Sequence, residues 1–174
     1  GVGGCVDRQE GSAILTRSPD CEMSFGPHTL HRLGDMLTET LAKRKPVFDI
    51  SFPEIEKFDR MPEPRAEGPS AMVSIIEGCS KYCSFCVVPF TRGRERSRDA
   101  SSIIAESRDL FETGFKEVTL LGQNVDSYYI ADPNQNSANF NASQASISEA
   151  ITFATLLEMV AGISTYLRVR FSTS

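Results

Sequence analysis

Hydrophobic residues recur along the chain in short alternating runs and at helical spacings, which predicts alternating strands and helices. In residues 1–45, Cys21, Met23 and Phe25 alternate with polar residues and predict a short strand. Four leucines then share one predicted helix face, and basic residues suit its C-terminal end: Leu30, Leu33, Leu37, Leu41 and Lys43 to Lys45. This strand–helix pattern is compatible with an α/β domain.

A second block, residues 71–174, repeats the same rhythm. Strands are predicted at 72–76, 117–121 and 167–171. Helices are predicted between them, one beginning after Asp99 and ending before Gly114, and one over 153–160. A strand–helix–strand–helix–strand order implies parallel pairing with right-handed crossovers. Three such strands cannot close a barrel, so we expect a fragment of a larger protein.

Two segments break the pattern. Residues 46–70 hold five of the nine prolines, and proline favours extended chain without backbone donors, so we expect an interdomain linker there. Residues 131–150 are mostly Asn, Gln, Ser and Ala, which bury little surface, so we expect a polar insertion within the second block.

Composition narrows the class of protein. The chain has 174 residues, of which 40% are hydrophobic and 24% charged, as in globular proteins. Its net charge of −5 does not suit a protein that coats phosphates with positive charge, so nucleic-acid contact would need a local patch. The candidate patch is Arg92, Arg94, Arg96 and Arg98. No apolar run approaches the roughly 20 residues that cross a bilayer, and no signal peptide opens the chain, so we expect a cytoplasmic protein without membrane partners.

Three of the five cysteines form the spacing C-x3-C-x2-C directly after a predicted strand: Cys79, Cys83 and Cys86. Thiolates are soft ligands that select zinc, copper or iron–sulfur clusters. Both zinc and iron–sulfur sites usually take four ligands, so three suggest a cluster with one open iron. Two alternatives stay open, namely a zinc-stabilised RNA-binding module without catalysis and a thiol redox module that uses Cys83 and Cys86.

This region resembles a known family. C-x3-C-x2-C with an aromatic residue before the last cysteine looks like the radical S-adenosylmethionine (SAM) signature. The segments SIIEGCSKYCSFCVVPFTRGRERSR and EVTLLGQNV, with GVGGC, FGPHTLHRL and DISFPEIEKFDRMPEPRAEGPSA, resemble the tRNA-modifying (MiaB) branch of the methylthiotransferases. The resemblance implies the C-terminal part of an α/β methylthiotransferase domain, followed by the first half of a radical SAM (β/α) partial barrel.

The resemblance also implies cofactors. Cys79, Cys83 and Cys86 would hold a 4Fe–4S cluster whose open iron binds SAM. Phe85 would lie near the adenine of SAM, and Gln123 and Asn124, after the second predicted strand, would bind SAM or substrate. For Phe85 the alternative is packing beneath the loop, and for Gln123 and Asn124 it is turn formation.

A second 4Fe–4S cluster is implied too, with Cys5 as its only matching ligand, so this cluster would be incomplete in the chain. Cys21 matches no ligand position and is expected to be buried. The implied reaction adds a methylthio group to isopentenyladenosine beside the anticodon of tRNA, with an electron-donor protein as partner. The alternative is the same chemistry on another target. We expect the chain alone to be inactive.

Several other polar residues are weaker candidates. Tyr128 and Tyr129 are candidates for stacking on a base. Ser172 and Thr173 end the third predicted strand, at the edge where α/β proteins bind ligands. His28 and His31 are expected on an ordinary helix surface.

Overall fold

The computed structural model describes residues 1–11, 13–26, 29–49, 51, 68–131 and 150–172, which form two compact units. Unit 1 comprises Gly1–Glu63 and Lys81–Gly93, and unit 2 comprises Pro64–Ser80 and Arg94–Ser174. Lys81–Gly93 group with the N-terminal residues. The division into residues 1–45, a linker at 46–70 and a second domain at 71–174 stays a prediction. No helix among the described residues is long and apolar enough to cross a membrane.

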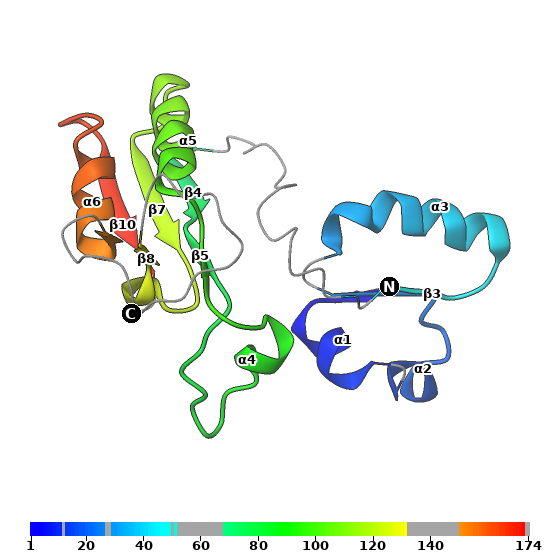
Figure 1. The fold of residues 1–174 in the computed structure, drawn as a ribbon. Helices are drawn as coiled ribbons and strands as arrows, with labels where there is room; N and C mark the ends of the chain where they lie inside the picture. The colour runs from blue at the N-terminus through cyan, green and yellow to red at the C-terminus, as the bar shows by residue number, and fades with distance from the viewer. Residues whose placement is uncertain (12, 27–28, 50, 52–67, 132–149, 173–174) are drawn as a thin grey trace. The chain divides into compact units, whose positions relative to one another are not determined.

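Unit 1 is built on a small parallel sheet in the order β1-β2-β3. Figure 1 shows this sheet edge-on, with α3 on one side and α1 and α2 on the other. Val2 pairs with Ser24, and Ser24 pairs with Phe48. The predicted strand at 21–25 is confirmed as β2. The elements of this unit are β1 (Val2–Gly3), α1 (Cys5–Glu10), α2 (Ala13–Arg17), β2 (Met23–Phe25), the 3-10 helix η1 (Leu30–Arg32), α3 (Leu33–Lys43), β3 (Val47–Asp49) and α4 (Val88–Thr91).

The predicted helix after β2 exists, but its buried face is not the leucine face. Leu30, Leu37 and Leu41 are 56%, 46% and 70% exposed, whereas Met36 and Thr40 of α3 are 4% and 6% exposed. Thr40 is satisfied at this depth because its hydroxyl donates to the carbonyl of Met36 over 2.8 Å. The spacing identified a helix, and the packing of α3 against β2 and β3 selected another face.

The predicted linker, residues 46–70, contains part of the sheet at its start. Val47–Asp49 form β3, which pairs in parallel with β2 through Met23 and Val47. Val and Phe suit an extended strand, and the neighbouring β2 offers backbone partners. Residues 52–67 of the predicted linker lie outside the described residues.

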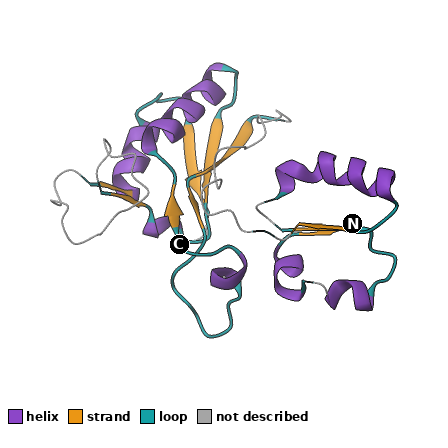
Figure 2. Ribbon diagram, turned by 45° about the vertical axis from the view of Figure 1, so that its right-hand side comes forward, coloured by secondary structure: helices purple, strands orange, loops and turns teal. Residues whose placement is uncertain are grey.

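Unit 2 contains the predicted parallel sheet, with strand order β10-β7-β4 (Figure 2). Ser70 and Arg168 both pair with Glu117, so the three strands run in register. The elements of this unit are β4 (Ser70–Ser74), β5 (Ile76–Glu77), β6 (Arg96–Ser97), α5 (Ala100–Glu112), β7 (Glu117–Leu121), the 3-10 helix η2 (Val125–Ser127), β8 (Tyr129–Ile130), β9 (Ile151–Thr152), α6 (Phe153–Ala161) and β10 (Arg168–Phe171).

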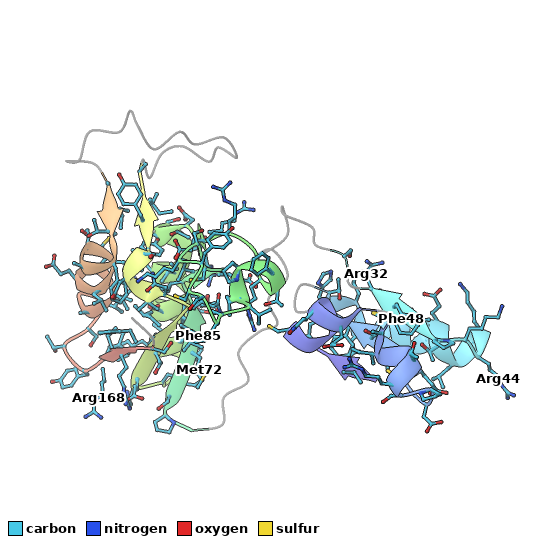
Figure 3. The ribbon with its side chains drawn as sticks, turned by 90° about the horizontal axis from the view of Figure 1, so that it is seen from below. Arg32, Arg44, Phe48, Met72, Phe85 and Arg168 are labelled. Carbon is cyan, nitrogen blue, oxygen red and sulfur yellow. The ribbon has the colours of Figure 1, made fainter. Side chains whose placement is uncertain are left out.

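The two long helices of unit 2 cover one face of this sheet. Val73 and Leu120 point into a shared core with Ile103 of α5 and Leu156 of α6, and all four are 0% exposed. The other face of the sheet is exposed, since Met72 of β4 is 70% exposed there (Figure 3). The period-two pattern that predicted the strands thus places apolar residues under the helices.

Polar caps and a glycine mark the helix ends in unit 2, and the predicted signals at Asp99 and Gly114 are confirmed. The carboxylate of Asp99 accepts a hydrogen bond from the Ser102 amide over 3.1 Å and caps α5. Gly114 follows the helix with a φ of 112°, in the left-handed region. At the other helix, the Thr152 hydroxyl accepts from the Thr155 amide and caps α6.

Two short antiparallel pairs complete unit 2. β5 pairs with β6 through Ile76–Ser97 and Glu77–Arg96, and β8 pairs with β9 through Tyr129–Thr152. The predicted insertion over 131–150 begins after β8. Its residues 132–149 lie outside the described residues.

Candidate iron–sulfur and SAM site

The three clustered cysteines lie in the segment between β5 and α4, here called the cysteine loop (residues 78–87). Their thiols are free, with Cys83 exposed and Cys79 and Cys86 partly buried. The amide of Cys86 donates to the carbonyl of Cys83 over 3.0 Å, so these two residues share a tight turn. Before them, Tyr82 has a φ of 48°, which is uncommon for a residue with a side chain.

The donor set of this loop fits an iron–sulfur cluster. Unpaired thiols in an irregular, accessible loop are the ligands that such clusters take. Among the described residues, no group of three or more His, Cys, Asp or Glu is arranged to hold a metal ion. The unit boundary falls inside the loop, since Cys79 belongs to unit 2 and Cys83 and Cys86 belong to unit 1. The assignment of ligands therefore rests on thiol chemistry and spacing.

The start of the cysteine loop is held by the segment that follows β7. The buried amide of Gly78 donates to the side-chain oxygen of Gln123 over 2.7 Å. Gly78 has a φ of 83°, a backbone conformation that favours glycine. Gln123, predicted to bind SAM, thus lies at the carboxyl end of the parallel sheet and contacts the residue before Cys79.

Asn124 is the second predicted residue of this turn, and it is 4% exposed. Its amide nitrogen lies 3.5 Å from a carboxylate oxygen of Glu95 and donates to the hydroxyl of Ser127. The amide of Glu95 in turn donates to the hydroxyl of Ser80 over 3.2 Å. Asn124 is therefore part of a buried polar contact between the turn after β7 and the chain that returns from the cysteine loop.

Aromatic residues surround the cysteines in sequence. Phe85 is 92% exposed, so packing beneath the loop, the alternative role considered for it, does not occur here (Figure 3). Tyr82 and Phe90 form an edge-to-face pair with ring centroids 6.0 Å apart. An exposed phenylalanine between two thiols is costly in water, and it is suited to contact with a flat apolar group.

The arginine-rich stretch after the loop has mixed roles. Arg98 is structural, because its guanidinium donates to the carboxylate of Glu106 and contacts the carbonyl of Ser74 over 3.4 Å. Arg96 lies in β6 and pairs with Glu77. Arg92 and Arg94 also have interactions within the chain. The stretch is thus built into the fold near the cysteine loop rather than extended as a free basic segment.

The two tyrosines proposed for base stacking differ sharply. Tyr128 is 1% exposed and its hydroxyl donates to the carbonyl of Arg98 over 2.8 Å, so its proposed stacking role is wrong. Burial, together with the nearby Asp99 carboxylate, raises the pKa of Tyr128 well above its ordinary value. Tyr129 is 43% exposed.

Cys5 begins α1, and Gly4 separates it from the end of β1. The amide of Gly4 donates to the carbonyl of Phe25 over 3.0 Å. The thiol of Cys5 is free and partly buried. Cys21 is 6% exposed and donates to the carbonyl of Met23, as expected for a buried cysteine without a ligand role. His31 lies on η1 and is exposed, and His28 lies outside the described residues.

Ser172 follows β10, and its amide donates to the carbonyl of Leu120 over 3.0 Å. It therefore lies at the carboxyl end of the sheet, as do Gln123 and Gly78. Thr173 lies outside the described residues.

Comparison with known proteins decides the family. The sequence profile of the Radical SAM superfamily matches residues 73–166, more than half of the chain. The chain belongs to the radical SAM superfamily. The matched residues include the last two residues of β4, the cysteine loop and the whole of β7, whereas β10 lies beyond them. Membership in this superfamily implies a 4Fe–4S cluster and SAM as cofactors.

Relatives in this superfamily confirm the resemblance to the tRNA-modifying branch. Over all 174 residues the chain is 55% identical to a protein of Shewanella halifaxensis and 52% identical to one of Coxiella burnetii, each named tRNA-2-methylthio-N(6)-dimethylallyladenosine synthase. A third relative so named, from an Enterobacter species, is 53% identical. The chain spans about a third of their length, covering 34%, 37% and 34% respectively.

Sequence reasoning missed residues that contact the cysteine loop and the chain beside it. Gly78, Ser80 and Glu95 were not singled out, and neither was Gly122, which precedes Gln123. One sequence signal could have predicted the positive φ of Gly78, because a glycine lies directly between a strand and the first cysteine. No sequence signal could have predicted the partners of Ser80 and Glu95, because their hydrogen bonds join segments that are distant in sequence.

Proposed function

We propose that the chain is part of a radical SAM enzyme that adds a methylthio group to isopentenyladenosine beside the anticodon of tRNA. The observation that carries this proposal is a loop of three free thiols that leaves a parallel sheet at its carboxyl end, in a chain with relatives of that name. This edge of an α/β sheet is where ligands bind in such folds.

We assign Cys79, Cys83 and Cys86 as the three ligands of the SAM-binding 4Fe–4S cluster. When bound, the cluster supplies the electron that cleaves the sulfonium bond of SAM. The exposure of the Cys83 thiol supports this role, because a cluster ligand must be accessible when the cluster is assembled.

We propose roles in SAM binding for Phe85, Gln123 and Asn124. The exposed ring of Phe85 suits the flat adenine. Gln123 would use its NH2 group, since its oxygen already accepts from Gly78. The side chain of Asn124 is buried and engaged, so its contribution would come through the turn that it supports.

Cys5 is proposed as one ligand of a second 4Fe–4S cluster. Its free thiol at the start of α1 and at the carboxyl end of the β1-β2-β3 sheet supports this proposal. The proposed partners are tRNA and an electron-donor protein, and the proposed compartment is the cytoplasm, where tRNA is modified.

Anaerobic reconstitution with iron and sulfide tests the SAM-binding site. We expect about four irons per SAM site, and an electron paramagnetic resonance signal of the reduced sample that changes when SAM is added. Cys83→Ala should lose this signal, whereas Cys21→Ala, at a buried cysteine without a ligand role, should keep it. A chain that binds zinc tightly and builds no cluster would contradict the proposal.

A further inference from the structure

We propose that Gln123 is a positioning residue for the cysteine loop, so that the turn after β7 sets where the first cluster ligand lies. This inference rests on the proposed function, because it assigns a role toward the cluster held by Cys79. It adds that the side-chain oxygen of Gln123 acts on the protein backbone, separately from any contact with SAM.

Gln123 and Gly78 are joined by a hydrogen bond. Gly78 is buried, and its amide donates to Gln123 Oε1 over 2.7 Å. A buried backbone N–H without an acceptor is costly, so the loop cannot keep this path without a partner for it. Gly78 is bonded directly to Cys79, so fixing this peptide also fixes the starting direction of the cysteine loop.

A close approach brings these two segments together. A Cβ atom added at Gly122 would lie 2.3 Å from Ile76 Cγ2 and 3.1 Å from the Ile76 carbonyl oxygen. The turn after β7 can therefore pass next to β5 only because residue 122 is glycine. This contact places Gln123 within reach of Gly78, although 45 residues separate them in sequence.

The same turn also contacts the chain where it returns from the cysteine loop. Glu95, just before β6, donates its amide to Ser80 Oγ and lies with its carboxylate 3.5 Å from the amide nitrogen of Asn124. The same turn thus contacts both the outgoing and the returning chain of the loop. Gln123 contacts the outgoing chain and Asn124 contacts the returning chain, and all of these residues belong to unit 2.

These contacts have a common consequence. The base of the cysteine loop is fixed by polar contacts from β7, and this leaves the thiols beyond it to adapt to a cluster. A hydrogen-bond acceptor at residue 123 is then needed for efficient cluster assembly. Its loss should slow assembly even where the fold of unit 2 is intact.

The test uses three variants of the whole chain. Gln123→Met keeps the length of the side chain and removes the acceptor, and Gln123→Glu keeps an acceptor oxygen. Gln9→Met makes the first of these changes at an exposed position of α1 and is the matched control. Amide hydrogen exchange is measured in the metal-free chain, and cluster assembly with iron and sulfide is followed by absorbance and electron paramagnetic resonance.

We expect the Gly78 amide to exchange about fivefold faster in Gln123→Met, from the net free energy of one hydrogen bond. Cluster assembly should slow by a similar factor of about five, and Gln123→Glu should restore both. Amides of Ile103 and Leu110 in α5 should keep their exchange rates, which shows that unit 2 remains folded.

Equal exchange of Gly78 in the wild type and Gln123→Met would overturn the inference, whatever the cluster does. Faster exchange with unchanged assembly would also overturn it, because the bond would then serve the fold alone. A wild-type chain that builds no cluster would instead reject the proposed function, while the exchange measurement would still decide whether Gln123 holds Gly78.

Discussion

The hydroxyl of Tyr128 donates to the backbone carbonyl of Arg98 over 2.8 Å and so ties η2 to the residue that precedes the cap of α5. We expect Tyr128→Phe to destabilise the chain by about 1–2 kcal/mol, because the Arg98 carbonyl loses its partner. Urea unfolding measures this change. Tyr166→Phe is the control, since Tyr166 is 82% exposed and should change stability little.

The raised pKa of Tyr128 leads to a prediction of how the free energy of unfolding depends on pH. Its pKa is raised in the folded chain, mainly by burial and then by the Asp99 carboxylate, so the folded state holds the phenol proton more tightly than the unfolded state. This contribution is fully present below the ordinary tyrosine pKa of about 10 and is lost as pH rises above it. The wild type should therefore lose more stability than Tyr128→Phe between pH 9 and 11. Equal losses would contradict this assignment.

The cap of α5 gives a second prediction. Burial alone would raise the pKa of Asp99, but hydrogen bonds from Ser101 and Ser102 outweigh this effect and lower the pKa. We expect Asp99→Ala to cost about 1 kcal/mol in free energy of unfolding, and Asp99→Asn to cost less. Because the pKa is lowered, the stabilisation is present at neutral pH and is lost on acidification below about pH 4.

The exposed Asp109 on the same helix provides a control, since Asp109→Ala should not destabilise. Thermal unfolding at pH 7 and pH 3 separates the two positions. A cap effect of equal size at both pH values would show that the ionised carboxylate is not the stabilising form.

Gly122 gives a third prediction. Gly122→Ala should destabilise the chain by about 1–3 kcal/mol, because the new methyl group meets Ile76 at 2.3 Å. In Ile76→Ala the side-chain clash is absent, so the double variant should be more stable than the sum of the two single effects. Gly34→Ala, which would meet no atom within 4 Å, is expected to stabilise α3 slightly. Strict additivity of the Gly122 and Ile76 variants would reject the contact.

The faces of α3 give a fourth prediction. Met36→Ala should cost about 2 kcal/mol or more, because this side chain is 4% exposed. Leu41→Ala should cost less than about 0.5 kcal/mol, because Leu41 is 70% exposed. Chemical unfolding of the two variants compares them directly. A larger loss for Leu41 would restore the leucine face as the buried one.

The same helix shows where sequence reasoning succeeds and where it stops. The repeat of leucines correctly predicted a helix at 33–43, since periodicity depends only on local geometry. It did not identify Met36 and Thr40 as buried, because the face that packs is chosen by the β2 and β3 strands. Because of the prolines at 46 and 53, a linker was predicted where β3 lies. This strand forms by pairing with Met23–Phe25, which is distant in sequence.

In unit 2 the prediction reached further. The three strands of the parallel sheet and both long helices were predicted, because apolar alternation, the Asp99 cap and Gly114 are local signals. The two-residue strands β5, β6, β8 and β9 were not predicted. The cysteine loop was found for the same reason, since its three cysteines are close in sequence. The bond from Gly78 to Gln123 could not be predicted, because it requires the register of β4 with β7.

The pairing of Glu77 with Arg96 has a consequence for protein engineering, because it joins the two ends of the segment that contains the cysteine loop. Glu77 and Arg96 are paired neighbours in unit 2, so the ends of the segment between them are held together, and the entropy of closing it depends only weakly on its length. Residues 78–95 could therefore be exchanged for a short turn, or for the equivalent segment of another superfamily member, while the parallel sheet keeps its register. Such chimaeras would separate the cysteine loop from the sheet on which it is mounted.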